Sequence, residues 1–264
     1  MKTIKTIFLL ITAILIGMVF SCKHNSSLKI IAHRGASGYT TENTLSAVKK
    51  AAEMNSDAVE VDIWRTADDS LIVFHDRNTA RLTSDSLVIP KTTYKELRAL
   101  ELPNGSFIPT LREVLELLPS DMEIFIEIKC GGEEGEAGKV FPMLGEMLRG
   151  TGTLDQATVI SFNTETLIAS AENIPTVPIY WLTGKQQPTA RIINTANNTG
   201  VDGINVHYSL VSAELINQAQ NNNLEVYVWT VNDSEKATAL LQKYHITGIT
   251  TDYPNTIREA VKKE

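Results

Sequence analysis

Short apolar runs alternate with longer segments of helical spacing along the chain from residue 28 onward. The runs have the length of strands, and the segments between them repeat apolar residues every three or four positions. This alternation predicts an α/β fold built on a parallel sheet. Strands are expected over 29–33, 58–64, 71–74, 123–129, 158–162, 178–182, 202–205, 225–230 and 249–251. Helices are expected over 44–55, 110–118, 136–148, 164–172, 190–197, 212–222, 234–244 and 256–262.

One of the nine predicted strands does not fit a parallel sheet. The connection between 64 and 71 is too short for a parallel crossover, which needs roughly a dozen residues. We therefore expect 71–74 to run antiparallel, as the second arm of a hairpin. The other eight strands, with helices between them, match a (β/α)₈ TIM barrel with an extra hairpin.

Two stretches lack a strong period and are expected to lie beside the mouth of this barrel. Residues 77–107 contain a short helical pattern around 94–100 and a turn at 103–105, which predicts a small insertion after the second barrel strand. Residues 131–138 are rich in Gly and Glu and follow the fourth barrel strand. We interpret them as a mobile loop over the site.

The second strand carries acidic residues on one face. Alternation places Glu60 and Asp62 on one side, with Val59, Val61 and Ile63 on the apolar side. Two carboxylates one strand period apart repel each other unless a cation, a proton or a positive side chain lies between them. A metal ion is the simplest occupant.

The strand over 123–129 adds a third carboxylate. Phe125, Glu127 and Lys129 alternate with isoleucines and are expected to face the barrel interior near its mouth, where such barrels have their active sites. Glu127 would then meet the two carboxylates of the second strand. All-oxygen ligands favour Mg²⁺ or Ca²⁺. The alternative is a salt-bridge network with Arg34 and Lys129.

Two histidines end strands at the same mouth, His33 after the first strand and His75 after the hairpin. A single histidine there is more often structural, but two beside the same carboxylates suit a general acid and a general base. Arg34 either pairs at the surface or, with Lys129, forms an anion cradle. Trp229 either belongs to the rim or packs against a bound alcohol.

The first residues follow a different pattern. Lys2 and Lys5 precede an apolar run over 7–20 that ends at Ser21 and Cys22. A positive start, a short apolar run and a small residue before the break are typical of a secretory signal. We expect a lipoprotein signal peptide over 1–21, a tether over 22–27 and the barrel domain over 28–264.

The run 19–22 resembles a bacterial lipobox, in which the cysteine becomes the lipid-bearing first residue. Lipid on Cys22 would anchor the protein to a membrane of the bacterial cell envelope, as a periplasmic or outer-membrane lipoprotein. The alternative is an ordinary cleaved signal with a coincidental cysteine. Cys130 is the only other cysteine, so lipid on Cys22 leaves no intramolecular disulfide, and stability must come from the core.

Composition agrees with one globular domain. The chain has 264 residues, 43% of them hydrophobic and 21% charged, enough for a sizeable core. The formal net charge is −7 and becomes −9 when Lys2 and Lys5 are lost with the signal. Such an acidic balance argues against a nucleic-acid partner, because phosphate backbones bind basic patches.

Eight short motifs, in this order, give the chain from about Ile30 to its end a resemblance to the glycerophosphodiester phosphodiesterase family. They are His33-Arg34-Gly35, Glu42-Asn43-Thr44, Glu60-x-Asp62, His75-Asp76, Pro109-Thr110-Leu111, Glu127-x-Lys129, Trp229-Thr230-Val231-Asn232 and Thr251-Asp252-Tyr253-Pro254. Thr41 departs from the family, which often has proline there, and we expect this difference to alter only a loop.

The resemblance implies a phosphodiesterase barrel that releases an alcohol and glycerol 3-phosphate by way of a cyclic phosphate. It implies a divalent cation, Ca²⁺ or Mg²⁺, held by Glu60, Asp62 and Glu127. It also implies that His33 and His75 act as general acid and base, and that Arg34 and Lys129 bind the phosphate. Asp76 either orients His75 or forms an Asx turn.

Two other functions stay open at this stage. A related barrel could cleave intact lipids, as phospholipase C-like or D-like proteins do, but the polar insertion shows little sign of the apolar rim this requires. A lipoprotein could also keep the barrel and only bind a phosphorylated ligand. The sequence carries no signal for the headgroup or the oligomeric state.

Overall fold

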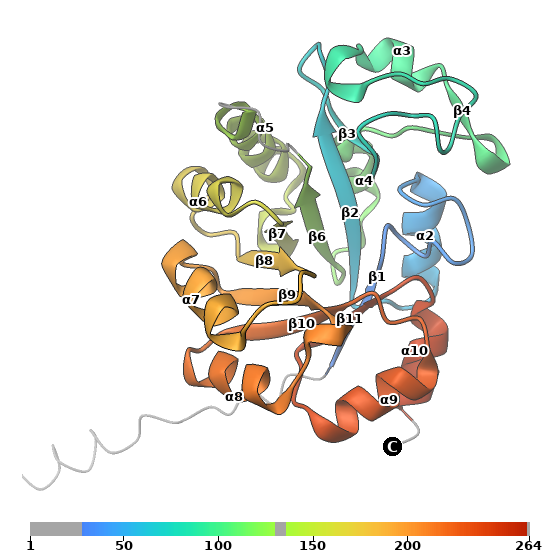
Figure 1. Cartoon of the computed structure of the whole chain (residues 1–264). Coiled ribbons are helices and arrows are strands. Elements are labelled where there is room, and N and C mark those ends of the chain that lie inside the picture. Colours follow the sequence, from blue (N-terminus) through green and yellow to red (C-terminus); the bar gives the residue numbers. More distant parts are fainter. Residues whose placement is uncertain (1–27, 130–135, 263–264) are drawn as a thin grey trace, which may run out of the picture.

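The computed structural model describes residues 28–129 and 136–262. Eight parallel strands close into a barrel in the order β1-β11-β10-β9-β8-β7-β6-β2, and β2 pairs back onto β1 (Figure 1). The predicted TIM barrel is confirmed. The strands are β1 (Lys29–Ala32), β2 (Ala58–Arg65), β3 (Leu71–Val73), β4 (Glu101–Leu102), β5 (Ser106–Phe107), β6 (Glu123–Ile128), β7 (Ala157–Ser161), β8 (Ile179–Thr183), β9 (Gly203–His207), β10 (Glu225–Trp229) and β11 (Gly248–Thr251).

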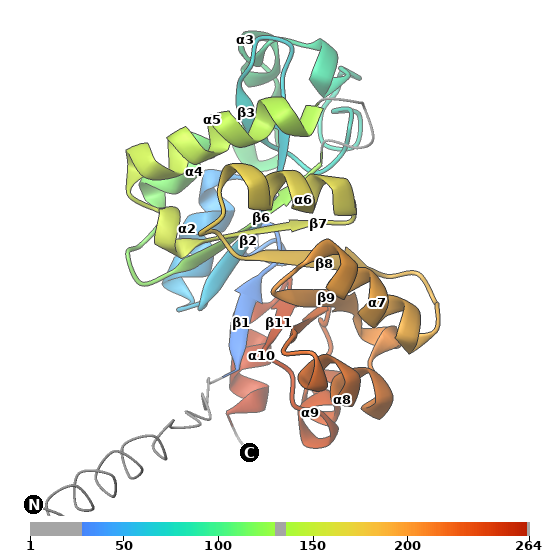
Figure 2. The same cartoon turned by 90° about the vertical axis from the view of Figure 1, so that its left-hand side faces the viewer.

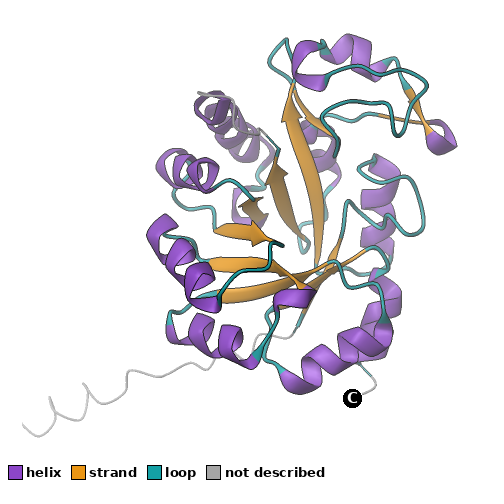
Figure 3. Ribbon diagram, viewed as in Figure 1, coloured by secondary structure: helices purple, strands orange, loops and turns teal. Residues whose placement is uncertain are grey.

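Helices surround the barrel on the outside, as the purple ribbons around the orange strands of Figure 3 show. The helices are α2 (Leu45–Glu53), α3 (Tyr94–Arg98), α4 (Leu111–Leu117), α5 (Glu136–Thr151), α6 (Thr164–Asn173), α7 (Thr189–Thr199), α8 (Ala213–Asn221), α9 (Ser234–Lys243) and α10 (Pro254–Val261). Short 3₁₀ helices lie at Ile89–Lys91, Pro103–Gly105, Leu154–Gln156 and Tyr208–Leu210.

Capping side chains decide where several of these helices begin. Thr44, Thr110, Asn163, Ser212 and Asp233 each accept a hydrogen bond from a backbone N–H in the first turn of the helix that follows. Such caps satisfy one of the donors that a helix start leaves unpaired. The predicted helices therefore begin close to the observed positions.

The barrel strands separate two apolar layers. Ile124, Ile126 and Ile128 pack outward with the helices, while Phe125 points into the barrel, as the alternation predicts. Inside, the ring of Phe125 lies 5.2 Å from that of Tyr227, which stacks on a further interior ring, Tyr180, at 5.0 Å. These rings fill the barrel below the charged residues.

The hairpin and the insertion form a lobe above the barrel, seen with α3 at the top of Figure 2. β3 is antiparallel to β2, with Ile63 opposite Val73, as predicted. Residues 77–107 fold over this hairpin. The lobe has its own small core, made of Trp64, Ile72, Phe74, Ile89, Leu97, Leu102 and Ile108. Its two-residue strands β4 and β5 were not predicted, because such short strands carry no periodic pattern.

Several predictions concern residues outside the described ranges. The predicted signal and tether, which includes Cys22, and residues 131–135 of the predicted loop lie there. Residues 136–138 were predicted both as the end of that loop and as the start of the helix over 136–148. They form the first turn of α5, so the helix prediction is confirmed there and the loop prediction is wrong. Among the described residues, no helix is both long enough and apolar enough to span a membrane.

Candidate active site

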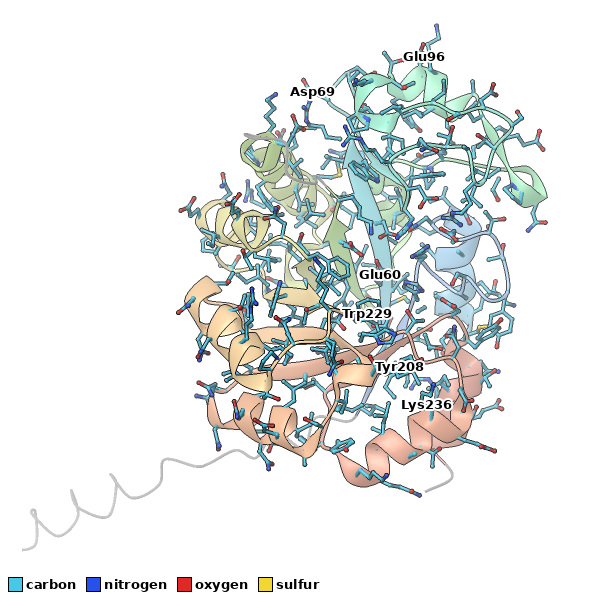
Figure 4. The ribbon with its side chains drawn as sticks, in the orientation of Figure 1. Glu60, Asp69, Glu96, Tyr208, Trp229 and Lys236 are labelled. Carbon is cyan, nitrogen blue, oxygen red and sulfur yellow. The ribbon has the colours of Figure 1, made fainter. Side chains whose placement is uncertain are left out.

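The predicted site residues meet at the carboxyl ends of the barrel strands. Together they surround one cavity of about 130 Å³. Asp62 lies beside the cavity and contacts its walls, and Glu60 and Trp229 lie near the centre of the barrel in Figure 4. The predicted residues that line the cavity are His33, Arg34, Glu60, His75, Glu127, Lys129 and Trp229.

The carboxylate cluster follows from strand register. β2 and β6 pair so that Asp62 lies beside Glu127, and Glu60 points to the same side two residues earlier. One carboxylate oxygen from each residue lies within 4.8 Å of the others. All three side chains are buried. The sequence therefore predicted correctly that these carboxylates converge.

Two cationic side chains contact this cluster. Lys129 Nζ lies 2.7 Å from Glu127 Oε1 and 3.1 Å from Asp62 Oδ1. Arg34 Nε lies 3.4 Å from Asp62 Oδ2. The salt-bridge alternative thus describes real contacts, but it does not satisfy the whole cluster. Glu60 Oε1 is buried without a hydrogen-bond partner among the described residues.

The pKa values show how unevenly the charges are balanced. Burial, with repulsion from Asp62, raises the pKa of Glu60 well above its usual value and that of Glu127 to about 7. Burial alone would also raise the pKa of Asp62, but Lys129 and Arg34 outweigh it and lower that pKa. Three carboxylates facing two cations fit a bound cation whose ligands are oxygens.

The backbone turn after β1 adds a further contact to the cluster. Gly35 has a φ of 78°, and a Cβ there would lie 2.5 Å from the Cβ of Ala47, so only glycine fits this close approach. The turn directs the N–H of Arg34 at Glu60 Oε2, 2.8 Å away. Asn43, to which the sequence analysis gave no role, donates to Asp62 Oδ2 at 2.7 Å and is buried.

His33 is held by a residue from the other end of the chain. Its Nδ1 lies 2.6 Å from Asp252 Oδ1. Ser37 Oγ and Asn232 Nδ2 donate to the same carboxylate at 2.9 and 2.6 Å. Although burial acts in the opposite direction, the hydrogen bonds from His33, Asn232 and Ser37 lower the pKa of Asp252 to about 2. Sequence reasoning gave Asp252 no role.

His75 has an equivalent partner close in sequence. Its Nδ1 lies 2.7 Å from Asp76 Oδ1, which is the contact required if Asp76 orients His75, the first of its two alternative roles. Burial, with the charges of Lys129 and Arg34, lowers the pKa of His75. Because each histidine has its Nδ1 against a carboxylate, Nδ1 carries the hydrogen and Nε2 is the nitrogen left for a ligand.

The opposite wall of the cavity is apolar. Trp229 donates from Nε1 to the carbonyl of Asn205 at 3.0 Å, and the ring of Phe162 meets its ring edge-on at 5.6 Å. Leu182 and Ile160 complete this wall. Phe162, half exposed at 50%, was predicted only as the end of a strand. The cavity therefore has a charged half and an aromatic half.

The barrel, its mouth and the cluster of charged residues there define a (β/α)₈-barrel enzyme. The family model described as the glycerophosphoryl diester phosphodiesterase family matches residues 33–256, and the chain belongs to this family. YhdW of Bacillus subtilis is 31% identical over 246 residues, covering 89% of this chain and 98% of the relative. A glycerophosphodiester phosphodiesterase from Caldanaerobacter subterraneus is 29% identical over 250 residues, covering 89% and 98%.

Solved structures agree with the fold. A crystal structure from Silicibacter pomeroyi superposes with a TM-score of 0.82 at 22% identity, covering 91% of this chain and 95% of the other. A phosphodiesterase from Oleispira antarctica, in complex with its product sn-glycerol-3-phosphate, has a TM-score of 0.81 at 25% identity, covering 89% and 96%.

The depressed pKa of Asp252 predicts a pH-dependent contribution to stability. This contribution is complete above the pKa of aspartate in the unfolded chain, ~3.9, and is lost as the pH falls towards about 2. We expect Asp252→Asn to lower the free energy of unfolding by about 2 kcal/mol at neutral pH, and by progressively less between pH ~4 and ~2.

Urea denaturation of both proteins across this pH range measures the difference. Asp121→Asn, at an exposed position, is the control and should change the free energy of unfolding little at any pH. A wild-type advantage that stays constant down to the lowest pH would show that the charge of Asp252 does not stabilise the fold.

Proposed function

We propose that the chain hydrolyses glycerophosphodiesters to an alcohol and glycerol 3-phosphate, using a divalent cation and a pair of histidines. One observation carries the proposal: two imidazoles, each held at Nδ1 by a carboxylate, line the same cavity as the buried carboxylate cluster. The product bound to the Oleispira antarctica relative supports the choice of substrate.

Glu60, Asp62 and Glu127 are the residues that would hold the cation. Their all-oxygen donor set suits Ca²⁺ or Mg²⁺, and the unpartnered Glu60 Oε1 is a free ligand atom. A cation there would supply positive charge to the nonbridging oxygens of the phosphate.

Arg34 and Lys129 would bind the phosphate itself. Both line the cavity, and both already compensate carboxylates at its edge. A guanidinium and an ammonium on one side of a phosphate neutralise its charge and fix its orientation. The alcohol that leaves would then lie towards the aromatic half, against Trp229.

The lowered pKa of His75 suits the role of base, because its imidazole is neutral at neutral pH. His75 takes the proton of the glycerol hydroxyl next to the phosphate, and that oxygen attacks phosphorus. The bond from phosphorus to the leaving alcohol breaks. His33, which enters this step with a hydrogen on both ring nitrogens, gives the alcohol oxygen the proton of Nε2 and keeps the one that Nδ1 shares with Asp252. In the second half the roles reverse, and water opens the cyclic phosphate to glycerol 3-phosphate.

Removal of the cation should abolish turnover. We expect the fragment that begins after Cys22 to release glycerol 3-phosphate from glycerophosphocholine. A chelator should stop this release, and either Ca²⁺ or Mg²⁺ should restore it.

Glu127→Gln should lower the rate at least ~100-fold, because one charged ligand is lost. Glu123→Gln, on the same strand but paired with Lys29 away from the cavity, is the control. Full activity in the chelator would contradict a metal-dependent reaction.

The two histidines should be needed for turnover and not for folding. We expect His33→Ala and His75→Ala each to lower kcat by ~10² to 10⁴, the usual contribution of a general acid or base. Circular dichroism should show that both variants stay folded. His33→Ala also loses the contact with Asp252 and should unfold at a somewhat lower urea concentration than the wild type. His245→Ala, at an exposed position, is the control. A wild-type rate in either cavity variant would remove that histidine from the mechanism.

We also propose that residues 1–21 are removed and that lipid on Cys22 anchors the protein in the bacterial cell envelope. The charged start, the apolar run and the lipobox-like end of the sequence support this location. Cys22→Ser should move the protein from the membrane fraction to the soluble fraction of its host, while Cys130→Ser should not. Equal membrane association of the two variants would argue against the anchor.

A further inference from the structure

We propose that Arg81, from the insertion, is a positioning residue for both halves of the charged site. Through Asp76 it fixes the orientation and tautomer of His75, and through Glu42 it fixes Arg34. The kinetic part of this inference rests on the proposed function, in which His75 and Arg34 act on the phosphodiester.

Arg81 contacts two carboxylates at once, those of Asp76 and Glu42. Its Nε donates to Asp76 Oδ2 at 2.5 Å. Its two terminal nitrogens donate to the two carboxylate oxygens of Glu42, at 2.6 and 2.9 Å. A planar guanidinium can bind one carboxylate in this two-pronged way and still use its third nitrogen for another. One side chain therefore joins two carboxylates that are far apart in sequence.

Each of these carboxylates also makes a hydrogen bond with a residue that lines the cavity. Asp76 Oδ1 lies 2.7 Å from His75 Nδ1. Glu42 Oε1 accepts from a terminal nitrogen of Arg34 at 2.9 Å. The result is a continuous chain of contacts from the imidazole of His75 to the guanidinium of Arg34, with Arg81 in its middle.

A plain surface ion pair is the alternative, since the Arg81 side chain is 44% exposed and exposed pairs contribute only about 0–1 kcal/mol. The partners of Arg81 argue against it. The side chains of Glu42 and Asp76 are only 17% and 29% exposed. Because these carboxylates are largely enclosed and shared with cavity residues, the three ion pairs form a network in which each fixes the next.

The backbone around Arg81 is itself fixed. The fully buried Thr79 uses its hydroxyl to donate to the carbonyl of Asp85 at 2.5 Å and to accept from the N–H of Leu87 at 3.0 Å. The carbonyl of Thr79 also accepts from the N–H of Leu82. These bonds close the segment 79–87 into a compact loop, so Arg81 extends towards the site from an anchored position.

The consequence for His75 is chemical. Asp76 holds the hydrogen on Nδ1 and leaves Nε2 as the proton acceptor. Without Arg81, Asp76 loses the partner of its other oxygen and can turn away from the imidazole. His75 then samples the tautomer with hydrogen on Nε2, which cannot act as a base there. Lysine in place of Arg81 keeps the charge, but a point charge cannot span both carboxylates.

Steady-state kinetics with glycerophosphocholine and the restored cation test this. We expect Arg81→Gln to lower kcat by about 10- to 100-fold, less than loss of the base itself, with a smaller rise in KM. Arg81→Lys should recover part of kcat. The matched control is Arg98→Gln: this arginine is 38% exposed and joins α3 of the insertion to Glu113 at 3.1 Å, but it contacts none of the cavity residues.

The control separates two explanations. If losing one ion pair merely loosens the insertion, Arg98→Gln and Arg81→Gln should lower kcat equally, and that result would overturn the proposal. If Arg81 positions His75 and Arg34, only Arg81→Gln lowers kcat, and Arg98→Gln keeps it within about twofold, as expected for a substitution remote from the site.

A second readout needs no substrate. Nitrogen-15 NMR of the histidine side chains, at a pH where His75 is neutral, reports which ring nitrogen carries hydrogen. We expect Nδ1–H in the wild type and in Arg98→Gln, and a mixture of both tautomers in Arg81→Gln. Retention of the pure wild-type tautomer in Arg81→Gln would refute the positioning role. Absence of wild-type turnover with every glycerophosphodiester would instead refute the proposed function and leave this NMR comparison valid.

Discussion

Repulsion among three enclosed carboxylates is the constraint around which the site is built. Glu60, Asp62 and Glu127 bring oxygens within 4.8 Å of one another, and burying even one ionised carboxylate without a partner costs several kcal/mol. Lys129 and Arg34 offset this cost unevenly. Asp62 contacts both cations and has a lowered pKa, whereas Glu60 and Glu127 keep raised pKa values. The carboxylate charge left unpaired would be neutralised by a cation, so the same imbalance that destabilises the fold supports the proposed cation site.

Inside the barrel, an aromatic layer lies below the charged layer and helps to offset the free-energy cost of burying the carboxylates. Along β6 and at the residue that follows it, successive inward positions change from aromatic at Phe125 to acidic at Glu127 and then to basic at Lys129. Phe125 belongs to the ring cluster below the mouth, with Tyr180 and Tyr227. These buried rings fill the lower barrel, and their burial is one of the favourable contributions that oppose the repulsion above. The charged layer therefore lies directly above a packed apolar layer inside the barrel.

Local patterns in the sequence account for much of this arrangement. Alternation within β2 and β6 gave the correct inward faces, and the short connection after β2 gave the antiparallel hairpin. The partner of His33 could not be found in this way. Asp252 lies 219 residues away, and the contact depends on closure of the barrel, in which Ala32 pairs with Thr251. No local period determines that register. Asn43 was missed for a related reason, because its contact with Asp62 depends on a turn with a φ of 55°.

The two histidine–aspartate pairs differ in what holds the aspartate, and this difference gives the insertion a role at a cavity that none of its own residues lines. Asp252 receives hydrogen bonds from neutral groups on the barrel loops, Ser37 and Asn232, so closure of the barrel alone completes that pair. Asp76 instead receives its second contact from the cation of Arg81. One histidine is therefore positioned by the barrel and the other by the barrel together with the insertion. A change in how the insertion packs over β3 acts on the second histidine through charge, even where it leaves the eight-stranded barrel unaltered.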